Sequence, residues 1–261
     1  MKVLFTTLLA IVCMGVLLWG NIHWTQKTAV SGSNDASPSV TATKKAPVEG
    51  DPTDSLTQLT ENWPTEAAES FEKAIEEKRI YKILLVGSPA LGDDQTGWAA
   101  STKEQLIAAY GEENMEVEIR TYSLSSLGFI NEDGAEQIAN AQADMVLFEP
   151  FTLMDNGEVS VENSLANLQQ VMDETLEAKP ETAFVLMPPH PIYNAVYYPK
   201  QVEALKNYAE ENEIPYLDHW QAWPDYQTEE IKDYISSDNS QPNEQGHEVW
   251  SKYVIEYLIS K

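Results

Sequence analysis

Three unbroken runs of apolar residues constrain the fold of this chain more than any other feature. The runs are Ile83–Val86, Met145–Phe148 and Ala183–Met187. A strand with one face in water alternates apolar and polar residues, so unbroken runs indicate strands that are covered on both faces. Segments with helical spacing lie between them, among them Trp98–Tyr110 and Val161–Leu176. The pattern is typical of a parallel sheet with helices on both sides, which is an α/β fold.

Two weaker patterns complete the predicted sheet. Val117–Tyr122 alternates as a strand, and Tyr216–Leu217 continues a short strand after a proline, so five strands are predicted. Further helices are predicted over 57–78, 135–142, 199–211 and 244–259, and Ser160 is the expected N-cap of the helix that begins at Val161. Ligands of parallel sheets bind outside the carboxyl ends of the strands. The candidate site residues are therefore those at 87–88, 123–128, 149–156, 188–190 and 218–220.

The N-terminal part of the chain differs from the rest. Residues 3–19 are almost entirely apolar, follow Lys2 and precede no clear small-x-small cleavage site, so we favour a membrane anchor over a cleaved signal peptide. Residues 28–56 are rich in Ser, Thr, Ala and Pro, as flexible linkers are. We expect an anchor or signal at 1–24, a linker at 25–56 and one domain at 57–261. The positive charge of Lys2 favours an N-terminus on the cytoplasmic side, which places the domain outside the cytoplasm.

Composition excludes several classes of function. The chain has 42 acidic and 16 basic residues and a net charge of −26, which disfavours binding to nucleic acids and to anionic lipids. Its one cysteine, Cys13, lies in the apolar segment, so the domain has no disulfide, cysteine-zinc site or cysteine nucleophile. Phosphate-binding, dinucleotide-binding and His-x-x-x-His motifs are absent, and we expect no cofactor and no metal. The histidines of the domain are His190, His219 and His247.

Two segments carry the residues best suited to catalysis. Ser88 directly follows the first strand, where its hydroxyl would be presented beside backbone N–H groups that can stabilise an oxyanion. A serine there can equally cap a turn. The segment from Asp238 to His247 leads into the last predicted helix, and it pairs an acid with a histidine.

With these two segments the chain resembles the SGNH/GDSL hydrolases, a family of serine esterases and lipases. The resemblance covers about residues 80–261 and implies a three-layer α/β/α flavodoxin-like fold. The family's nucleophile matches Ser88, although the Asp that usually precedes it is Gly87 here. The family's last block, Asp-x-x-His-Pro-Asn-x-x-Gly-His, is matched at Asp238, Pro242, Asn243, Gly246 and His247. Gly128 and Asn156 match the family's oxyanion-hole residues, Asn156 with a shift of one or two positions.

Gln241 departs from the family pattern, because it stands where the catalytic histidine is expected. An amide cannot take up a proton near neutral pH, so Gln241 cannot serve as the general base. Another histidine takes the role, or the enzyme works slowly without a base, or the fold has lost hydrolysis. We favour His247 as the base, with Asp238 behind it, and leave His190 and His219 as alternatives.

The resemblance implies an extracytoplasmic hydrolase of acyl esters, with acetyl groups on cell-wall or exopolysaccharide sugars as the expected substrate. Ser88, Asp238 and His247 are the predicted catalytic residues, and Gly128 and Asn156 the predicted oxyanion-hole residues. Aromatic residues at 193–198 and 220–226 could stack on sugars or pack their own loops. Two alternatives remain open: a binding protein for carbohydrate or envelope components on the same fold, and a polysaccharide O-acyltransferase.

Overall fold

The computed structural model describes residues 52–238 and 240–260, so the predicted anchor and most of the predicted linker lie outside the described residues. The core of the domain is a parallel sheet with strand order β2-β1-β3-β4. The strands are β1 (Tyr81–Gly87), β2 (Met115–Thr121), β3 (Met145–Phe148) and β4 (Ala183–Leu186). The three unbroken apolar runs thus form β1, β3 and β4, and the predicted α/β fold is confirmed.

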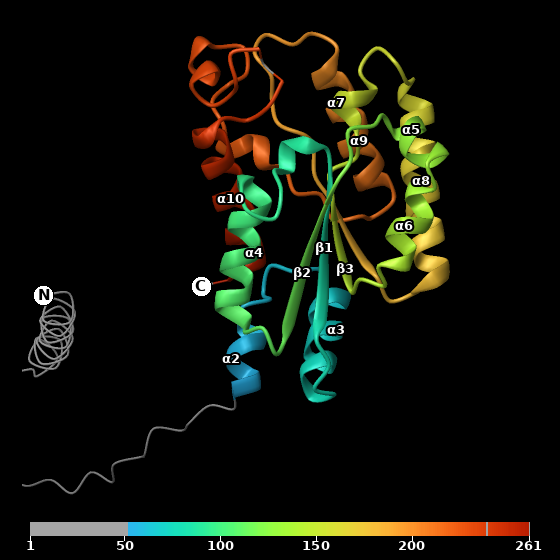
Figure 1. Ribbon diagram of the computed structural model, residues 1–261, viewed down its shortest axis with the longest axis vertical. Coiled ribbons are helices and arrows are strands. Elements are labelled where there is room, and N and C mark those ends of the chain that lie inside the picture. Colours follow the sequence, from blue (N-terminus) through green and yellow to red (C-terminus); the bar gives the residue numbers. More distant parts are fainter. Residues whose placement is uncertain (1–51, 239, 261) are drawn as a thin grey trace, which may run out of the picture. The chain divides into compact units, whose positions relative to one another are not determined.

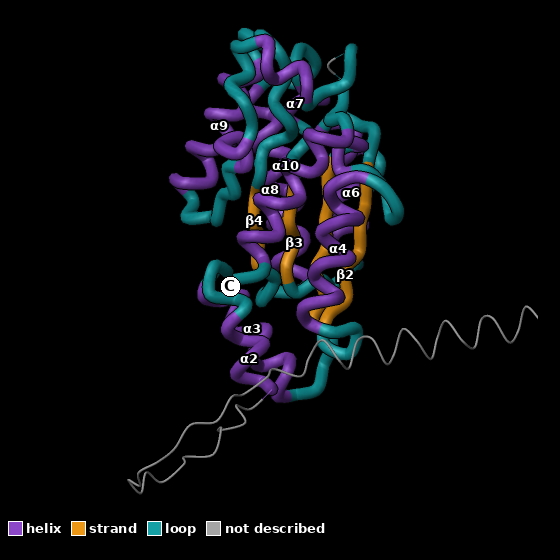
Figure 2. The backbone as a smooth tube through the Cα atoms, turned by 90° about the vertical axis from the view of Figure 1, so that its left-hand side faces the viewer, coloured by secondary structure: helices purple, strands orange, loops and turns teal. Residues whose placement is uncertain are grey.

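Both faces of the sheet are covered, which explains the unbroken apolar runs in β1, β3 and β4. Successive side chains of a strand point to opposite faces. Ile83 and Leu85 pack into one core with α3, α4 and α10, whereas Leu84 and Val86 pack into a second core with α5, α6, α8 and α9. Figure 1 shows α4 and α10 on one side of the strands and α5, α6, α8 and α9 on the other, and Figure 2 shows the four strands side by side. The helices that cover the faces are α3 (Thr65–Glu76), α4 (Gly97–Tyr110), α5 (Ser126–Asn131), α6 (Gly134–Asn140), α8 (Val161–Ala178), α9 (Tyr198–Glu211) and α10 (Glu244–Leu258).

The fifth predicted strand is reduced to a single bridge. Tyr216 pairs in parallel with Leu186 of β4, and the Leu217 N–H donates to the Leu186 carbonyl at 2.7 Å. The segment cannot extend the ladder in either direction. Pro215 has no N–H to donate, and a 3₁₀ turn at His219–Ala222 follows at once. Among the described residues the sheet therefore has four strands, with the 216 segment beside β4 in the fifth position of the flavodoxin-like order.

The helical part of the chain differs from the sequence prediction in detail. One helix was predicted over 57–78, but the structure has α2 (Pro52–Gln58) and α3, with a turn between them. Two short helices, α5 and α7 (Thr152–Asp155), lie in segments for which no helix was predicted. The Ser160 N-cap is confirmed, because its side chain accepts a hydrogen bond from the Asn163 N–H. Every helix in the described part of the chain is too short or too polar to cross a membrane.

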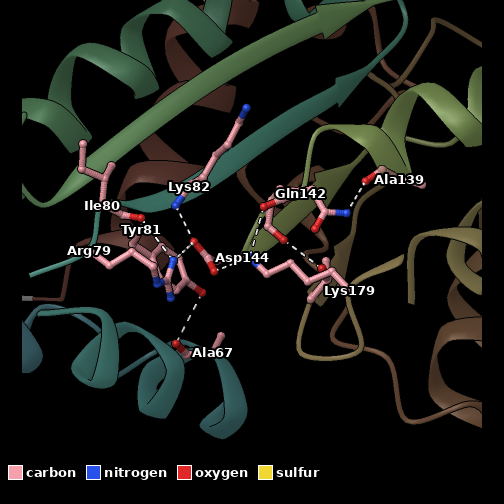
Figure 3. A network of polar contacts seen from close by, with 11 residues as sticks. Ala67, Arg79, Ile80, Tyr81, Lys82, Ala139, Gln142, Asp144 and Lys179 are labelled. Carbon is pink, nitrogen blue, oxygen red and sulfur yellow. Dashed lines mark hydrogen bonds and ion pairs between the residues drawn. The ribbon is translucent and has the colours of Figure 1, made fainter. Parts of the chain in front are cut away.

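An ion cluster closes the amino end of the sheet (Figure 3). Asp144, which directly precedes β3, is buried and accepts from the Arg79 guanidinium and from the Lys82 N–H, each at 2.7 Å. Its other oxygen bonds the ammonium of Lys179, at the end of α8. One carboxylate thus ties the starts of β1 and β3 to the end of α8. This cluster lies at the end of the strands opposite to the candidate site, and we assign it a structural role.

Candidate active site

Ser88 leaves β1 at the carboxyl edge of the sheet and begins the 3₁₀ turn η1 (Pro89–Leu91). Its backbone is extended, with φ −75° and ψ 171°, and its Oγ accepts from the Ala90 N–H at 3.3 Å. Pro89 and this cap fix the direction in which the chain leaves the strand. The side chain points inward rather than to solvent, because Ser88 is only 4% exposed.

The partner of Ser88 is a carboxyl group that follows β3. The Ser88 hydroxyl donates to Glu149 Oε2 at 2.7 Å, and the Ser88 N–H donates to the same oxygen at 2.9 Å. Strand register brings the two residues together, because Val86 pairs with Phe148 and the Glu149 N–H donates to the Val86 carbonyl. Gly87 makes the close approach possible, since a Cβ there would lie 2.7 Å from Glu149.

Glu149 is a fully buried acidic residue with an incomplete set of hydrogen bonds within the described part of the chain. It is fully buried, and its Oε1 accepts no hydrogen bond from any residue that the structure describes. Burial raises the pKa of Glu149 to about 8, and the two hydrogen bonds from Ser88 oppose that shift. The carboxyl group is therefore mostly protonated at neutral pH and becomes charged in mildly alkaline solution.

The predicted acid Asp238 and the predicted base His247 form hydrogen bonds with residues other than Ser88. His247 is half-buried in the first turn of α10, and its Nδ1 accepts from the Trp98 N–H at the start of α4, at 3.2 Å. Burial lowers the pKa of His247. Asp238 is exposed and accepts hydrogen bonds from Ser236 and Ser240, which lower the pKa of its carboxyl to about 2. Across residues 52–238 and 240–260, no hydrogen bond joins Ser88, Asp238 and His247.

The predicted oxyanion donors also have partners within the chain. The Ser88 N–H points to Glu149, and the Gly128 N–H donates to the Ser125 hydroxyl at 3.3 Å, which caps α5. Asn156 is exposed at the end of α7. Its neighbour Asp155 is the buried residue, and it accepts from the Ser126 N–H at 2.7 Å. The oxyanion roles of Gly128 and Asn156 stay predictions, and the role of Gly128 requires that its hydrogen bond break.

The two remaining histidines lie at the same edge of the sheet. His219 is fully buried, with its Nε2 at 2.8 Å from the Pro188 carbonyl and its Nδ1 accepting from the Trp223 indole at 2.9 Å. Its ring stacks on Trp250 and its pKa is lowered by burial to about 3, so it stays neutral. His190 is also fully buried, and its carbonyl accepts from the Tyr198 hydroxyl at 2.9 Å. Both ring nitrogens of His219 are therefore engaged within the chain.

Glu149 is the residue to which sequence reasoning gave no role. It lies in the stretch 149–156 that the strand ends single out, but the family pattern directs attention to an amide further along. The available signal was an acidic residue directly after a fully apolar strand. As to metals, the described residues contain no group of three or more His, Cys, Asp or Glu side chains that could hold an ion.

Comparisons with known proteins identify the fold. No protein-family model and no curated protein matches the sequence. Among solved structures, a GDSL-like lipase from Parabacteroides merdae is similar with a TM-score of 0.58 and 17% identity, covering 69% of this chain and 96% of that one. An acetylxylan esterase from Geobacillus stearothermophilus has a TM-score of 0.54 and 18% identity, with the same coverage. A carbohydrate esterase of family 3 from Talaromyces cellulolyticus has a TM-score of 0.57 and 14% identity, again with this coverage.

Proposed function

We propose that this chain is a serine hydrolase that cleaves acyl esters. Its fold is that of the GDSL-type hydrolases, as the resemblance in its sequence predicted. The observation that carries the proposal is the position of Ser88, at the carboxyl end of β1 with its hydroxyl hydrogen-bonded to a buried carboxyl group. β1 and β3 meet where the strand order reverses, and ligands of such sheets bind at this point.

The chemistry begins at the Ser88 oxygen. Oγ attacks the acyl carbon of the ester as the hydroxyl proton leaves, the bond to the alcohol breaks, and the acyl group stays on Ser88. A water molecule then attacks the same carbon, and the acid departs as Oγ regains a proton. Because Ser88 is 4% exposed, the loops at the carboxyl edge must shift before an ester reaches Oγ. We expect slow turnover of bulky esters for this reason.

Acetyl esters of carbohydrates are the substrate class that we propose. Two of the similar solved structures are an acetylxylan esterase and a carbohydrate esterase, and their names support this choice. We further propose that the domain acts outside the cytoplasm on cell-wall or exopolysaccharide sugars, held to the membrane by residues 1–24. The apolar sequence at 3–19 and the linker composition after it support that location.

A second function, non-catalytic binding of carbohydrate or envelope components, is favoured by one observation. Gln241 replaces the expected base, and its backbone N–H and carbonyl pair with Ser236 in a tight loop. Under this alternative Ser88 and Glu149 only fasten β1 to β3. A polysaccharide O-acyltransferase would use the same serine but pass the acyl group to a sugar rather than to water.

The test compares the full-length protein with Ser88→Ala, using p-nitrophenyl acetate and an acetylated xylooligosaccharide. Ser101→Ala, at an exposed position of α4, is the matched control. We expect Ser88→Ala to lower the rate of acetate release by about 10³-fold or more, and the control to equal the wild type. Equal rates for wild type and Ser88→Ala would refute hydrolysis at this serine and favour the binding protein. A rate that depends on an added sugar acceptor would favour acyl transfer.

A further inference from the structure

We propose that Glu149, rather than a histidine, is the general base that takes the proton from Ser88. This inference rests on the proposed ester hydrolysis and names the proton acceptor that the substitution at Gln241 leaves open. Glu149 would be a catalytic residue in the strict sense, because it contacts the reacting oxygen.

The first argument is geometric. A general base must lie within hydrogen-bond reach of the proton that it takes, about 2.6–3.2 Å between heavy atoms. Glu149 Oε2 lies 2.7 Å from Ser88 Oγ, whereas the ring hydrogen bonds of His219 and His247 go to other residues. The position of Oε2 is set by strand pairing, because Glu149 follows β3 directly and its N–H is bonded to β1. No long loop has to close to bring the two groups together.

The second argument concerns the lone pairs of two of the histidines, His247 and His219. In a neutral imidazole one nitrogen accepts and the other carries the proton. His247 accepts from the Trp98 N–H through Nδ1, so its Nε2 carries the proton and cannot take another. His219 accepts from the Trp223 indole through Nδ1 and donates from Nε2 to the Pro188 carbonyl. Neither ring has a nitrogen left that could accept the Ser88 proton.

The third argument is that the carboxyl group has no structural counter-charge. A buried carboxylate is costly unless it is paired, and carboxyl groups held for stability are usually in ion pairs. Asp144 at the other end of the sheet has Arg79 and Lys179 as partners. For Glu149 the described residues supply only the two hydrogen bonds from Ser88, and Oε1 has none. Such a group is poised to change its protonation state.

The groups that face Glu149 set its titration. Ser88, at the end of β1, donates a hydrogen bond to Glu149. The pKa of Tyr198, on α9, is raised mainly by burial and further by the negative charge of Glu149. The pKa of Glu149, raised by burial to about 8, lies close to neutral pH. A base works best when its pKa is close to the ambient pH, since it is then both available and strong enough.

The proton and electron balance is complete with this one group. As Ser88 Oγ bonds to the acyl carbon, its proton moves to Glu149 Oε2. When the bond to the alcohol breaks, Glu149 returns that proton to the leaving oxygen. In the second half, water loses a proton to Glu149 as it attacks the acyl carbon, and Ser88 Oγ receives that proton as the carboxylic acid leaves. No other reactant is needed.

The experiment measures kcat and KM of the full-length protein for p-nitrophenyl acetate between pH 5 and pH 10. Glu149→Gln keeps an oxygen that accepts the Ser88 hydrogen bonds but cannot take a proton. Glu158→Gln is the matched control, since it makes the same change at an exposed position that follows the same strand. Ser88→Ala, His247→Gln and His190→Gln are measured alongside. Circular dichroism and thermal unfolding establish that each variant is folded.

We expect the wild-type kcat/KM to rise tenfold per pH unit and to level off near pH 8. Glu149→Gln should lower kcat by about 10²–10⁴-fold with little change in KM, and it should remove the inflection. Glu149→Asp, which keeps a carboxylate at a longer distance from Oγ, should keep an inflection at a reduced rate. This variant also serves if Glu149→Gln fails to fold.

Two outcomes would overturn the inference, and they differ in what else they refute. If Ser88→Ala is inactive while Glu149→Gln keeps the wild-type rate and inflection, hydrolysis stands and the base is another group. Loss of the inflection in His247→Gln or His190→Gln, but not in Glu149→Gln, would assign that histidine. If Ser88→Ala and the wild type are equally active, the proposed function itself is wrong, and the proposed role of Glu149 is refuted as well.

Discussion

The buried carboxyl group of Glu149 leads to a prediction about stability that does not depend on catalysis. The perturbation is Glu149→Gln, which replaces a titrating group by a neutral one of nearly the same shape. The pKa of Glu149 is about 8 in the folded protein and 4.5 in an unfolded chain. Below pH 4.5 Glu149 is protonated in both states, so it contributes nothing to the pH dependence of the free energy of unfolding there.

The magnitude follows from the protons bound in each state. Between pH 4.5 and about 8 the unfolded chain has lost the proton that the folded protein keeps, so the free energy of unfolding falls as pH rises. The slope is about 1 kcal/mol per pH unit, which amounts to about 3 kcal/mol between pH 5 and pH 8. Above about pH 8 the carboxyl is ionised in both states and the loss is complete. Glu149→Gln should lack this loss.

The assay is urea unfolding at a series of pH values for the wild type, Glu149→Gln and the exposed control Glu158→Gln. The difference between wild type and Glu149→Gln isolates one group, because the other titrating residues are the same in both. We expect the two proteins to be within about 1 kcal/mol of each other at pH 5, where both carry a neutral group. At pH 8 the variant should be the more stable by about 3 kcal/mol.

A difference between wild type and Glu149→Gln that is the same at pH 5 and pH 8 would refute the reasoning. It would mean that Glu149 is ionised in the folded protein at both pH values. The carboxylate would then require a counter-charge or a solvent path that the described structure does not provide. A pH-dependent difference of the opposite sign would equally contradict a pKa raised by burial.

Three further changes test other parts of the structure by the same unfolding assay. His219→Gln should remove a loss of stability as pH falls from about 6.5 to 3, because the unfolded histidine takes up a proton that the buried one, with a pKa of about 3, does not. Ser160→Ala should destabilise the protein by about 1 kcal/mol through the lost cap of α8, with no change in activity. Gly246→Ala should cost about 3 kcal/mol or more, because its Cβ would lie 2.1 Å from the Tyr234 carbonyl oxygen. An unchanged unfolding midpoint for Gly246→Ala would contradict the close packing of α10 against that carbonyl.

Elements with a clear apolar pattern could be predicted from the sequence, whereas two very short helices could not. The apolar runs of β1, β3 and β4 and the helices α4, α8 and α10 have the predicted limits to within a few residues. A run of this kind is determined by burial on both faces, which leaves a clear mark in the sequence. The helices α5 and α7 have only six and four residues, too few for periodicity to show. The predicted fifth strand failed as a strand because Pro215 removes a donor from its ladder.

The candidate site could be predicted in part, for a related physical reason. Ser88 was found because its position after a buried strand is a property of local sequence. Glu149 has the same kind of position, but its importance comes from burial and from the absence of a counter-charge, which only tertiary structure shows. The contacts of His247 were likewise inaccessible, because the Trp98 N–H that it accepts from lies 149 positions away in sequence.

The topology of the sheet explains why the proposed base can follow β3 instead of preceding α10. β1 continues through α4 on one face of the sheet, and β3 continues through α8 on the other. The two connections therefore diverge, and Ser88 and Glu149 are left facing each other in the gap between them. A base before α10 depends on how the irregular segment after His219 folds, whereas Glu149 depends only on the pairing of Val86 with Phe148. Under the proposed role of Glu149, hydrolysis does not require a histidine at position 241, and Gln241 is compatible with an active enzyme.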